Sequence, residues 1–121
     1  MSNEYSITIA TCPDKDIAKS IAKLLVENQL AACVQMLPIE SVYIWQDKIC
    51  DETEIMLLIK SKTEMFGKIS DLIKKNHTYE VPEIIQIPIT AGLPEYLKWV
   101  EGWIGDVIYQ NSQQLQQSKL A

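Results

Sequence analysis

Apolar and polar residues repeat with two different periods along the first part of the chain. Residues 5–11 alternate at every second position and are rich in β-branched side chains, which predicts a strand. From Ile17 onward the apolar residues recur at helical spacing as far as Asn28. Asp14 and Asp16 place negative charge in the first turn, where the helix dipole favours it, so the pattern predicts a helix after the strand.

Two long apolar runs occupy the middle of the chain. Residues 31–46 and 49–60 are both rich in β-branched side chains, and Asp47 and Lys48 stand where they join. This length and spacing predict an extended hairpin, although no glycine marks its turn.

The second half of the chain returns to helical spacing. Ser61 and Glu64 have the spacing of a capping box, with Thr63 as an alternative cap, and the apolar face behind them predicts a second helix. The apolar run 84–89 predicts a further strand, and residues 92–94 open a third, terminal helix.

This order of elements is typical of an α+β fold, the ferredoxin-like βαββαβ sandwich, with an extended hairpin and an additional C-terminal helix. The spatial order of strands in that architecture is 4-1-3-2, so the second and fourth strands form the edges. Pro38 and Pro88 fall in these strands, where proline is tolerated because it cannot donate to a ladder. We expect one domain over residues 1–108 and a polar, glutamine-rich, disordered tail over residues 109–121.

The composition excludes several kinds of partner. The 121-residue chain has a formal net charge of -5, and all 11 of its basic residues are lysines. Nucleic-acid affinity depends on basic residues, and arginine is the most specific phosphate ligand, so we expect no nucleic-acid partner. No apolar run approaches the roughly 20 residues that span a bilayer, and the N-terminus lacks the pattern of a signal peptide. We therefore expect a cytoplasmic protein with no membrane partner.

The cysteines and the common uses of this fold narrow the chemistry. Cys12, Cys33 and Cys50 are far apart, so we expect free thiols, with Cys33 and Cys50 as small buried side chains. A metallochaperone would need a second cysteine where Lys15 stands. An RNA-binding surface would need aromatic side chains where residues 55–59 are aliphatic, and an acylphosphatase-like site would need an arginine.

The densest polar cluster is the segment 77–83, which contains His77, Tyr79, Glu80 and Glu83. An imidazole can bind a metal ion or transfer protons, and the carboxylates could supply oxygen ligands or orient the ring. A helix-end cap followed by a solvated turn explains the same residues, so both interpretations stay open.

A second cluster, Tyr43, Trp45 and Gln46, lies at the tip of the predicted hairpin. Aromatic side chains in such a place are more typical of an interface or a core than of a ligand cage. The hairpin is longer than a sandwich of this size needs, and two open sheet edges would invite aggregation. We therefore expect a closed ring of subunits with Tyr43 and Trp45 in the subunit interface.

Several spaced motifs resemble those of the CutA divalent-cation tolerance family, over about residues 7–104. They are Thr11-x-Pro13-Asp14, the run 30–34, Ser41-x-Tyr43-x-Trp45, Glu54, Lys60, the run 77–84, and Gly92-x-x-x-Tyr96-Leu97-x-Trp99. The resemblance implies a ferredoxin-like protomer related to the PII signalling proteins, a homotrimer, and a role in tolerance of copper and other divalent cations.

The chain departs from the family at the residues proposed to bind copper. Ala10 stands where the family has a cysteine, and Asn76-His77 stands where it has two adjacent histidines. Of those three ligands only His77 remains, and Cys12 is a weak substitute for the cysteine. The metal-ligand candidates are therefore His77, Glu80, Glu83 and, last, Cys12. We expect no required cofactor and weak, unselective binding of Cu(II) or another divalent cation.

The resemblance and the residues together predict a non-enzymatic, cytoplasmic homotrimer that binds metal ions or a small ligand in a cleft between subunits. The residues expected in the cleft or interface are Cys33, Tyr43, Trp45, Lys60 and Tyr79. Two alternatives remain. One is a PII-like sensor or partner-binding adaptor, and the other is a small enzyme that uses His77, Tyr79 and Glu80 as acid and base groups.

Overall fold

The structure is a computed structural model that describes residues 4–104. The helices and strands, in chain order, are β1 (Tyr5–Cys12), α1 (Lys15–Glu27), β2 (Cys33–Trp45), β3 (Lys48–Lys62), the 3₁₀ turn η1 (Thr63–Met65), α2 (Phe66–Asn76), β4 (Ile84–Pro88) and α3 (Pro94–Ile104). The predicted tail at residues 109–121, and the domain boundary at residue 108, lie outside the described residues.

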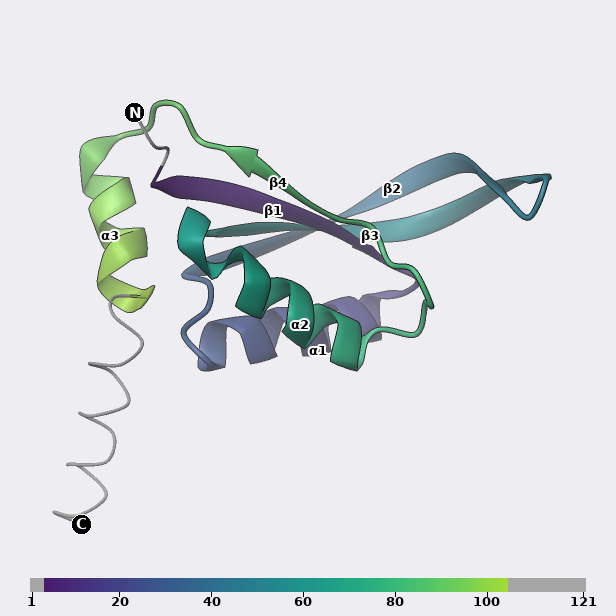
Figure 1. The fold of residues 1–121 in the computed structure, drawn as a ribbon, viewed down its shortest axis with the longest axis horizontal. Coiled ribbons are helices and arrows are strands. Elements are labelled where there is room, and N and C mark those ends of the chain that lie inside the picture. Colours follow the sequence, from purple (N-terminus) through teal and green to yellow (C-terminus); the bar gives the residue numbers. More distant parts are fainter. Residues whose placement is uncertain (1–3, 105–121) are drawn as a thin grey trace, which may run out of the picture.

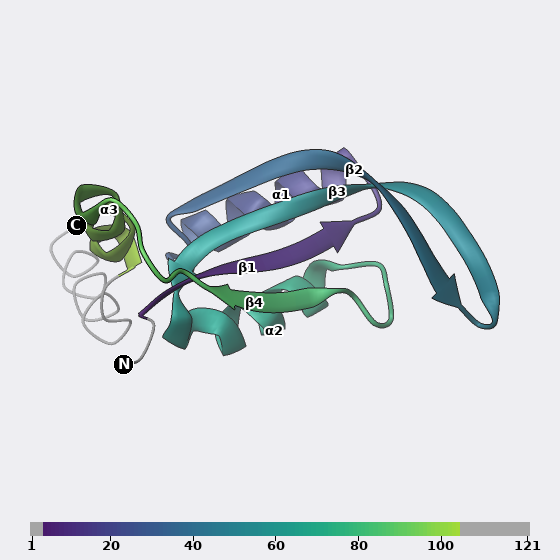
Figure 2. The same ribbon diagram turned by 90° about the horizontal axis from the view of Figure 1, so that it is seen from above.

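The four strands form one antiparallel sheet in the order β2-β3-β1-β4, with α1 and α2 packed side by side against one face (Figures 1 and 2). This confirms the α+β, ferredoxin-like fold and its edge strands. Pro38 lies in the edge strand β2, opposite Ile55, and Pro88 ends the edge strand β4. Both prolines therefore avoid the central strands, where each would remove a ladder hydrogen bond.

The core fills the space between the sheet and the two helices. Its large, fully buried side chains are Ile21 and Leu25 of α1, Leu57 and Ile59 of β3, Ile69 and Ile73 of α2, and Val100 and Ile104 of α3. Each such side chain contributes about 1.5–3 kcal/mol through removal from water. This packing holds β1, β3 and both helices as one rigid support for the segments that project from them.

Helix α1 has well-defined ends. Asp14 caps its N-terminus, because the side-chain Oδ1 accepts a hydrogen bond from the Ile17 amide at 2.9 Å. At the other end Gln29 adopts a left-handed conformation (φ 59°), and the Leu30 amide donates to the Leu25 carbonyl at 3.0 Å. This is a Schellman-type ending, which turns Leu30 back toward the core.

The predicted capping box before α2 is wrong. Ser61 belongs to β3, and its hydroxyl donates to the Leu30 carbonyl at 2.6 Å. Thr63 does not cap the helix either, because its hydroxyl is hydrogen-bonded to that of Ser6 in β1. The reason is that β3 continues to Lys62, opposite Tyr5, so the helix begins only after the turn η1.

The hairpin of β2 and β3 projects well beyond the rest of the sheet as a two-stranded arm (Figure 2). β1 pairs with β3 only as far as Cys12 opposite Ile55, so residues 48–54 of β3 have β2 as their one neighbour in the sheet. The turn consists of Gln46 and Asp47, one residue earlier than predicted, and both have positive φ (50° and 63°). Positive φ at both central residues is the feature of a type I′ turn, whose twist matches that of the flanking strands. Such a turn favours glycine but also accepts residues such as aspartate.

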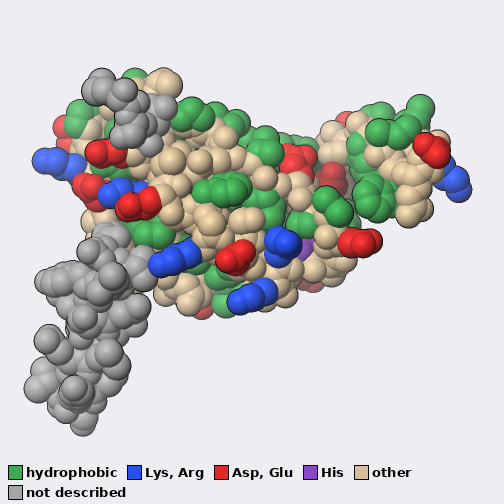
Figure 3. All heavy atoms as spheres, in the orientation of Figure 1, with side chains coloured by type: hydrophobic (Ala, Val, Ile, Leu, Met, Phe, Trp, Pro, Cys, Tyr) green, Lys and Arg blue, Asp and Glu red, His purple; other side chains and the backbone are tan. Residues whose placement is uncertain are grey.

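The helices leave the opposite face of the sheet uncovered among the described residues, and α3 lies beyond one end of the sheet (Figure 1). The side chains on this outer face are mostly apolar: Ile7, Ile9, Leu37, Ile39, Met56, Leu58, Ile85 and Ile87. Apolar residues also gather on the arm (Figure 3), where Val42, Ile44 and Ile49 are 70 %, 68 % and 79 % exposed. An antiparallel sheet with one solvated face is normally polar on that face, so this surface is unusual for a monomer.

None of the helices in residues 4–104 is both long and apolar enough to cross a membrane.

Candidate functional site

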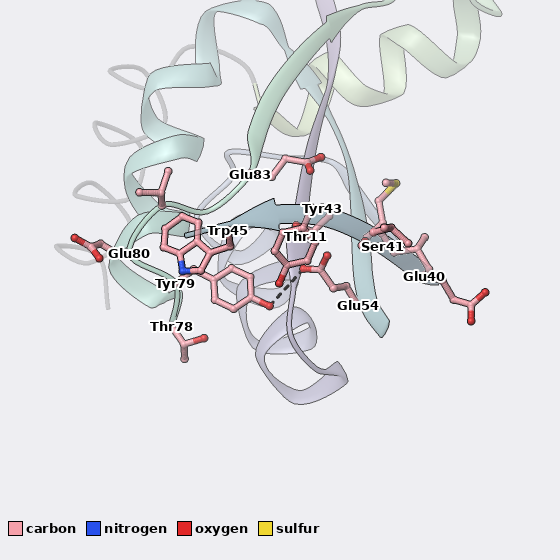
Figure 4. A pocket seen from close by; sticks show the side chains of 14 residues that line it. Thr11, Glu40, Ser41, Tyr43, Trp45, Glu54, Thr78, Tyr79, Glu80 and Glu83 are labelled. Carbon is pink, nitrogen blue, oxygen red and sulfur yellow. Dashed lines mark hydrogen bonds between the residues drawn. The ribbon is translucent and has the colours of Figure 1, made fainter. Parts of the chain in front are cut away.

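A groove of about 840 Å³ lies where the arm leaves the sheet, next to the loop between α2 and β4 (Figure 4). The arm contributes one wall and the loop contributes the other. The lining residues are Thr11, Ile39, Glu40, Ser41, Val42, Tyr43, Trp45, Glu54, Met56, Thr78, Tyr79, Glu80, Val81 and Glu83. The two clusters singled out in the sequence, 30 or more residues apart, therefore meet at one site.

The strand period explains why the aromatic side chains reach this groove. Ser41, Tyr43 and Trp45 follow Ile39 at every second position of β2, so all four share one face of the arm. Glu54 of β3 lies opposite Ile39 in the register and therefore shares that face. The groove is a continuation of the apolar outer face of the sheet, with polar groups added where the arm begins.

Glu54 is the buried acid of the site, with 7 % of its surface exposed. Its Oε2 accepts a hydrogen bond from the Tyr79 hydroxyl across a long 3.4 Å (Figure 4). Burial raises the pKa of Tyr79, and the negative charges of Glu54 and Glu52 add to the shift. Tyr79 is therefore a hydrogen-bond donor, not an anion, at neutral pH.

Tyr43 has a different carboxylate partner. Its hydroxyl donates to Oε2 of Glu52 at 2.8 Å, across the hairpin. This hydrogen bond, followed by desolvation and the charge of Glu52, raises the pKa of Tyr43 well above its usual value. This hydrogen bond fixes the direction of the hydroxyl, which stays protonated. The aromatic ring of Tyr43 is therefore the part that can contact a ligand in the groove.

His77 does not line the groove; it fastens the loop that does. Its Nε2 lies 2.7 Å from the carbonyl oxygen of Thr11, so Nε2–H must be the donor there. Its Nδ1 accepts from the Tyr79 amide at 3.0 Å, and the two rings lie 4.8 Å apart. Both ring nitrogens are therefore occupied by main-chain groups, and a metal ion at either would have to break one of these bonds.

The four predicted metal ligands are distributed over three environments. Glu80 and Glu83 line the groove, His77 lies behind its wall, and Cys12 is fully buried in the core. Burial raises the pKa of the Cys12 thiol to about 11, with the charges of Asp14 and Glu54 adding to it, so the thiolate that binds metals is disfavoured. Residues 4–104 contain no group of three or more histidine, cysteine or acidic side chains that could hold a metal ion.

The predicted cleft residues divide into two groups. Tyr43, Trp45 and Tyr79 lie at the groove, whereas Cys33 and Lys60 pair with each other at the other end of the hairpin. There Lys60 Nζ donates to Gln35 Oε1 at 2.6 Å and lies 5.6 Å from the centre of the Tyr96 ring. Apart from Tyr79, which lies in the loop between α2 and β4, these residues come from β2 and β3, and the length of the hairpin separates the two groups.

The expectation that Cys33 and Cys50 are buried is wrong for this chain, because both are only half-buried. Cys33 begins the edge strand β2, and Cys50 lies on the arm opposite Tyr43, so neither has a helix over it. All three cysteines are free thiols, as predicted.

Sequence reasoning did not single out Glu54 as the central acid of the site. Its signal is a carboxylate in phase with Met56 and Leu58 at every second position of β3. Such a position faces the same side as its apolar neighbours, so a charge there is surrounded by apolar surface. What the periodicity could not show is that the loop carrying Tyr79 covers this position.

The groove has a strongly one-sided charge. Four glutamates line it, Glu40, Glu54, Glu80 and Glu83, and no lysine does. Three aromatic rings and the aliphatic side chains of Ile39, Val42, Met56 and Val81 supply the rest of the lining. Such a surface favours positively charged ligands and disfavours anions.

Comparison with protein families agrees with this architecture. A family model described as "CutA1 divalent ion tolerance protein" matches residues 6–102. The divalent-cation tolerance protein CutA of Thermus thermophilus is 42 % identical over 95 residues, which cover 78 % of this chain and 92 % of that protein. The match includes both walls of the groove.

Solved structures are similar in fold as well. The crystal structure of CutA1 from the psychrotrophic bacterium Shewanella sp. SIB1 has a TM-score of 0.84 and 41 % identity, covering 88 % of this chain and all of that one. The periplasmic divalent cation tolerance protein CutA from Archaeoglobus fulgidus has a TM-score of 0.81 and 38 % identity, covering 83 % and 98 %.

Proposed function

Because the chain belongs to the CutA1 divalent ion tolerance family, we propose that it serves divalent-cation tolerance as a non-enzymatic homotrimer that binds a cationic ligand in the groove. The observation that carries this proposal is the position of the groove. It joins an acidic, aromatic pocket to an uncovered apolar sheet face, so a ligand and a second copy of the chain would meet there.

The apolar surfaces support self-association. A lone protomer would leave the outer face of the sheet and the arm residues Val42, Ile44 and Ile49 in water. Exposed apolar patches of this kind are typical of protein interfaces. The arm of one copy and the sheet of the next are different surfaces, and a contact between different surfaces forms a ring such as a trimer when the rotation between copies closes. The groove would then become a cleft between subunits, since Ile39 and Met56 belong to both surfaces.

The ligand we propose is a metal ion or a small cationic molecule. The lining offers carboxylate and hydroxyl oxygens, whereas the imidazole of His77 and the thiol of Cys12 lie outside it. Oxygen donors suit hard cations, and copper prefers nitrogen and sulfur ligands. We therefore expect copper to bind only weakly, since a copper ion at His77 would have to break one of its two hydrogen bonds.

The alternatives have less support. An acid–base enzyme would need His77 to exchange protons with a substrate, but both of its ring nitrogens are held by main-chain groups. A PII-like adaptor would present a long loop, whereas the hairpin ends in the two-residue turn of Gln46 and Asp47. For the compartment we retain the cytoplasm as our proposal, although the Archaeoglobus fulgidus relative is described as periplasmic.

Light scattering after size-exclusion chromatography tests the assembly. We expect a mass three times that of the 13.8 kDa protomer at micromolar concentration. Calorimetric titration with Mn²⁺, Mg²⁺ and Cu²⁺ should detect unselective binding that weakens in Glu54→Gln and not in Glu95→Gln, an exposed acid on α3 at the opposite end of the molecule. A monomeric mass would overturn the trimer, and a tight copper site lost in His77→Ala would overturn the assignment of the groove.

A further inference from the structure

We propose that the groove binds a small alkylammonium ion, with its ammonium group at Glu54 and its hydrocarbon part against the rings of Tyr43, Trp45 and Tyr79. This inference rests on the proposed function, because it concerns the same groove and names the class of cation. The aromatic and aliphatic lining of the groove is what favours an organic cation over a bare metal ion.

The aromatic walls are the first support. Tyr43 and Trp45 come from the arm and Tyr79 comes from the loop, so rings approach the hollow from both sides (Figure 4). Trp45 keeps 47 % of its surface exposed in the single chain, so in the proposed cleft between subunits its ring has surface for both a ligand and the second copy. Aromatic faces attract ammonium groups through their quadrupole and also pack against methylene groups.

The second support is the incomplete pairing of Glu54. The side chain is more than nine-tenths buried, yet the hydrogen bond that its carboxylate accepts from Tyr79 is long, at 3.4 Å. Hydrogen bonds from a hydroxyl to a carboxylate normally measure about 2.5–2.7 Å. None of the lysines of residues 4–104 forms an ion pair with Glu54. Among the described residues no buried side-chain oxygen is left without a partner, so an ammonium group would strengthen the pairing of Glu54 with a positive charge and further N–H donors.

The directions of two of the other three carboxylates, Glu80 and Glu40, make a bare metal ion the poorer ligand. Figure 4 shows Glu80 and Glu40 turned outward on opposite sides of the groove, away from Glu54. Ca²⁺ takes six to eight oxygen ligands, and Mg²⁺ takes six in near-ideal octahedral geometry, several of them water. An ammonium ion needs one buried carboxylate and a few acceptors.

The size and lining of the groove fit a compact organic ligand. Its volume of about 840 Å³ lies within the range of small-molecule sites. Ile39, Val42, Met56 and Val81 provide an aliphatic surface that a hydrated metal ion would not use. A short alkyl chain attached to the ammonium group would cover that surface and gain hydrophobic free energy.

Calorimetric titration of the full chain with n-butylammonium chloride tests the proposal directly. n-Butanol and n-butyrate serve as matched ligands of similar shape that are neutral or negatively charged. We expect saturable binding of n-butylammonium alone, reduced at least tenfold in Glu54→Gln and unchanged in Glu95→Gln. Binding of n-butanol with equal affinity, or no binding of n-butylammonium, would overturn the proposal.

A second variant keeps the test decisive if Glu54→Gln folds poorly. Trp45→Leu changes a half-exposed side chain, and we expect it to weaken n-butylammonium binding at least fivefold. Unchanged affinity in Trp45→Leu would overturn the role of the aromatic wall. Failure of the proposal is distinct from failure of the proposed function: a trimer that binds Mn²⁺ in the groove but not n-butylammonium refutes the organic cation alone, and a monomeric mass refutes the assembly alone.

Discussion

The Nε2–H group of His77 donates a hydrogen bond to the main-chain carbonyl of Thr11, 66 residues earlier in the chain, at 2.7 Å. Thr11 lies near the end of β1, and His77 is the residue at which α2 ends. The single histidine therefore connects the rigid sheet to the loop that forms one wall of the groove. Its second bond, from the Tyr79 amide to Nδ1, extends this connection into the loop itself.

Replacement of His77 by alanine should loosen this loop. Two hydrogen bonds and a ring contact with Tyr79 are lost, so we expect the free energy of unfolding to fall by about 1–3 kcal/mol. Urea unfolding followed by tryptophan fluorescence measures the change. Thr78→Ala, a change at the exposed neighbouring position, is the control and should alter the stability little. Equal stability of His77→Ala and the wild type would show that the imidazole does not fasten the loop.

The Cys12 thiol should be protected and slow to ionise. A chain carrying Cys33→Ala and Cys50→Ala leaves Cys12 as the single thiol, which we expect to react with a disulfide reagent only after unfolding in urea. Burial raises the pKa of Cys12 from 9.0 to about 11, so the unfolded chain loses this proton first as the pH rises. Cys12 therefore lowers the stability progressively between about pH 9 and pH 11. Rapid labelling of the folded chain at neutral pH would contradict the buried position.

Trp45→Ala should weaken the proposed assembly more than it weakens the protomer. Large aromatic side chains at the centre of an interface contribute on the order of 2 kcal/mol or more, and Trp45 contributes little to the core of its own chain. Light scattering over a dilution series should show dissociation at higher concentration than for the wild type. Trp99→Ala, on α3 at the other end of the molecule, gives a comparison with a similarly exposed tryptophan. A Trp45→Ala chain with the same mass at every dilution and the same melting temperature would exclude this residue from the interface.

The turn of the arm offers a stabilising substitution. Asp47 has a φ of 63°, a conformation that costs most residues about 1 kcal/mol and costs glycine little. We expect Asp47→Gly to raise the free energy of unfolding by about 0.5–1 kcal/mol, measured by urea unfolding. Lys48→Gly, which places the glycine at the first residue of β3 and not at a position of positive φ, should lower it instead. A loss of stability in Asp47→Gly would mean that the aspartate makes a contribution beyond its backbone conformation.

The order of the strands could be predicted because two independent signals coincide in the sequence. Hydrophobic periodicity identifies the elements, and Pro38 and Pro88 mark which strands lie at the edges. Local capping was harder to predict. Ser61 has the right spacing for a cap, but its strand pairs on as far as Lys62, and tertiary pairing outweighs a local motif.

The groove was only partly visible in the sequence. Its two walls each contain an unusual local cluster, around Tyr43 and around Tyr79, and each could be recognised separately. Their meeting depends on the loop being fastened by His77 to Thr11, a side-chain contact with a main-chain carbonyl. Every residue has a main-chain carbonyl, so the identity of the residue at position 11 does not indicate this contact. The central place of Glu54 depends on the same loop and could not be predicted from the sequence either.

The arm gives one continuous strand two very different neighbourhoods. From Ile55 to Lys60, β3 is paired on both sides, with β1 and with β2, whereas from Lys48 to Glu54 it has β2 alone. An isolated two-stranded ribbon is only marginally stable in water, so we expect amide protons in the arm to exchange with solvent far faster than those a few residues along in the sheet. The difference in exchange rate across Ile55 therefore reports on contacts of the arm. The more another molecule protects the amides of the arm, the smaller this difference should be.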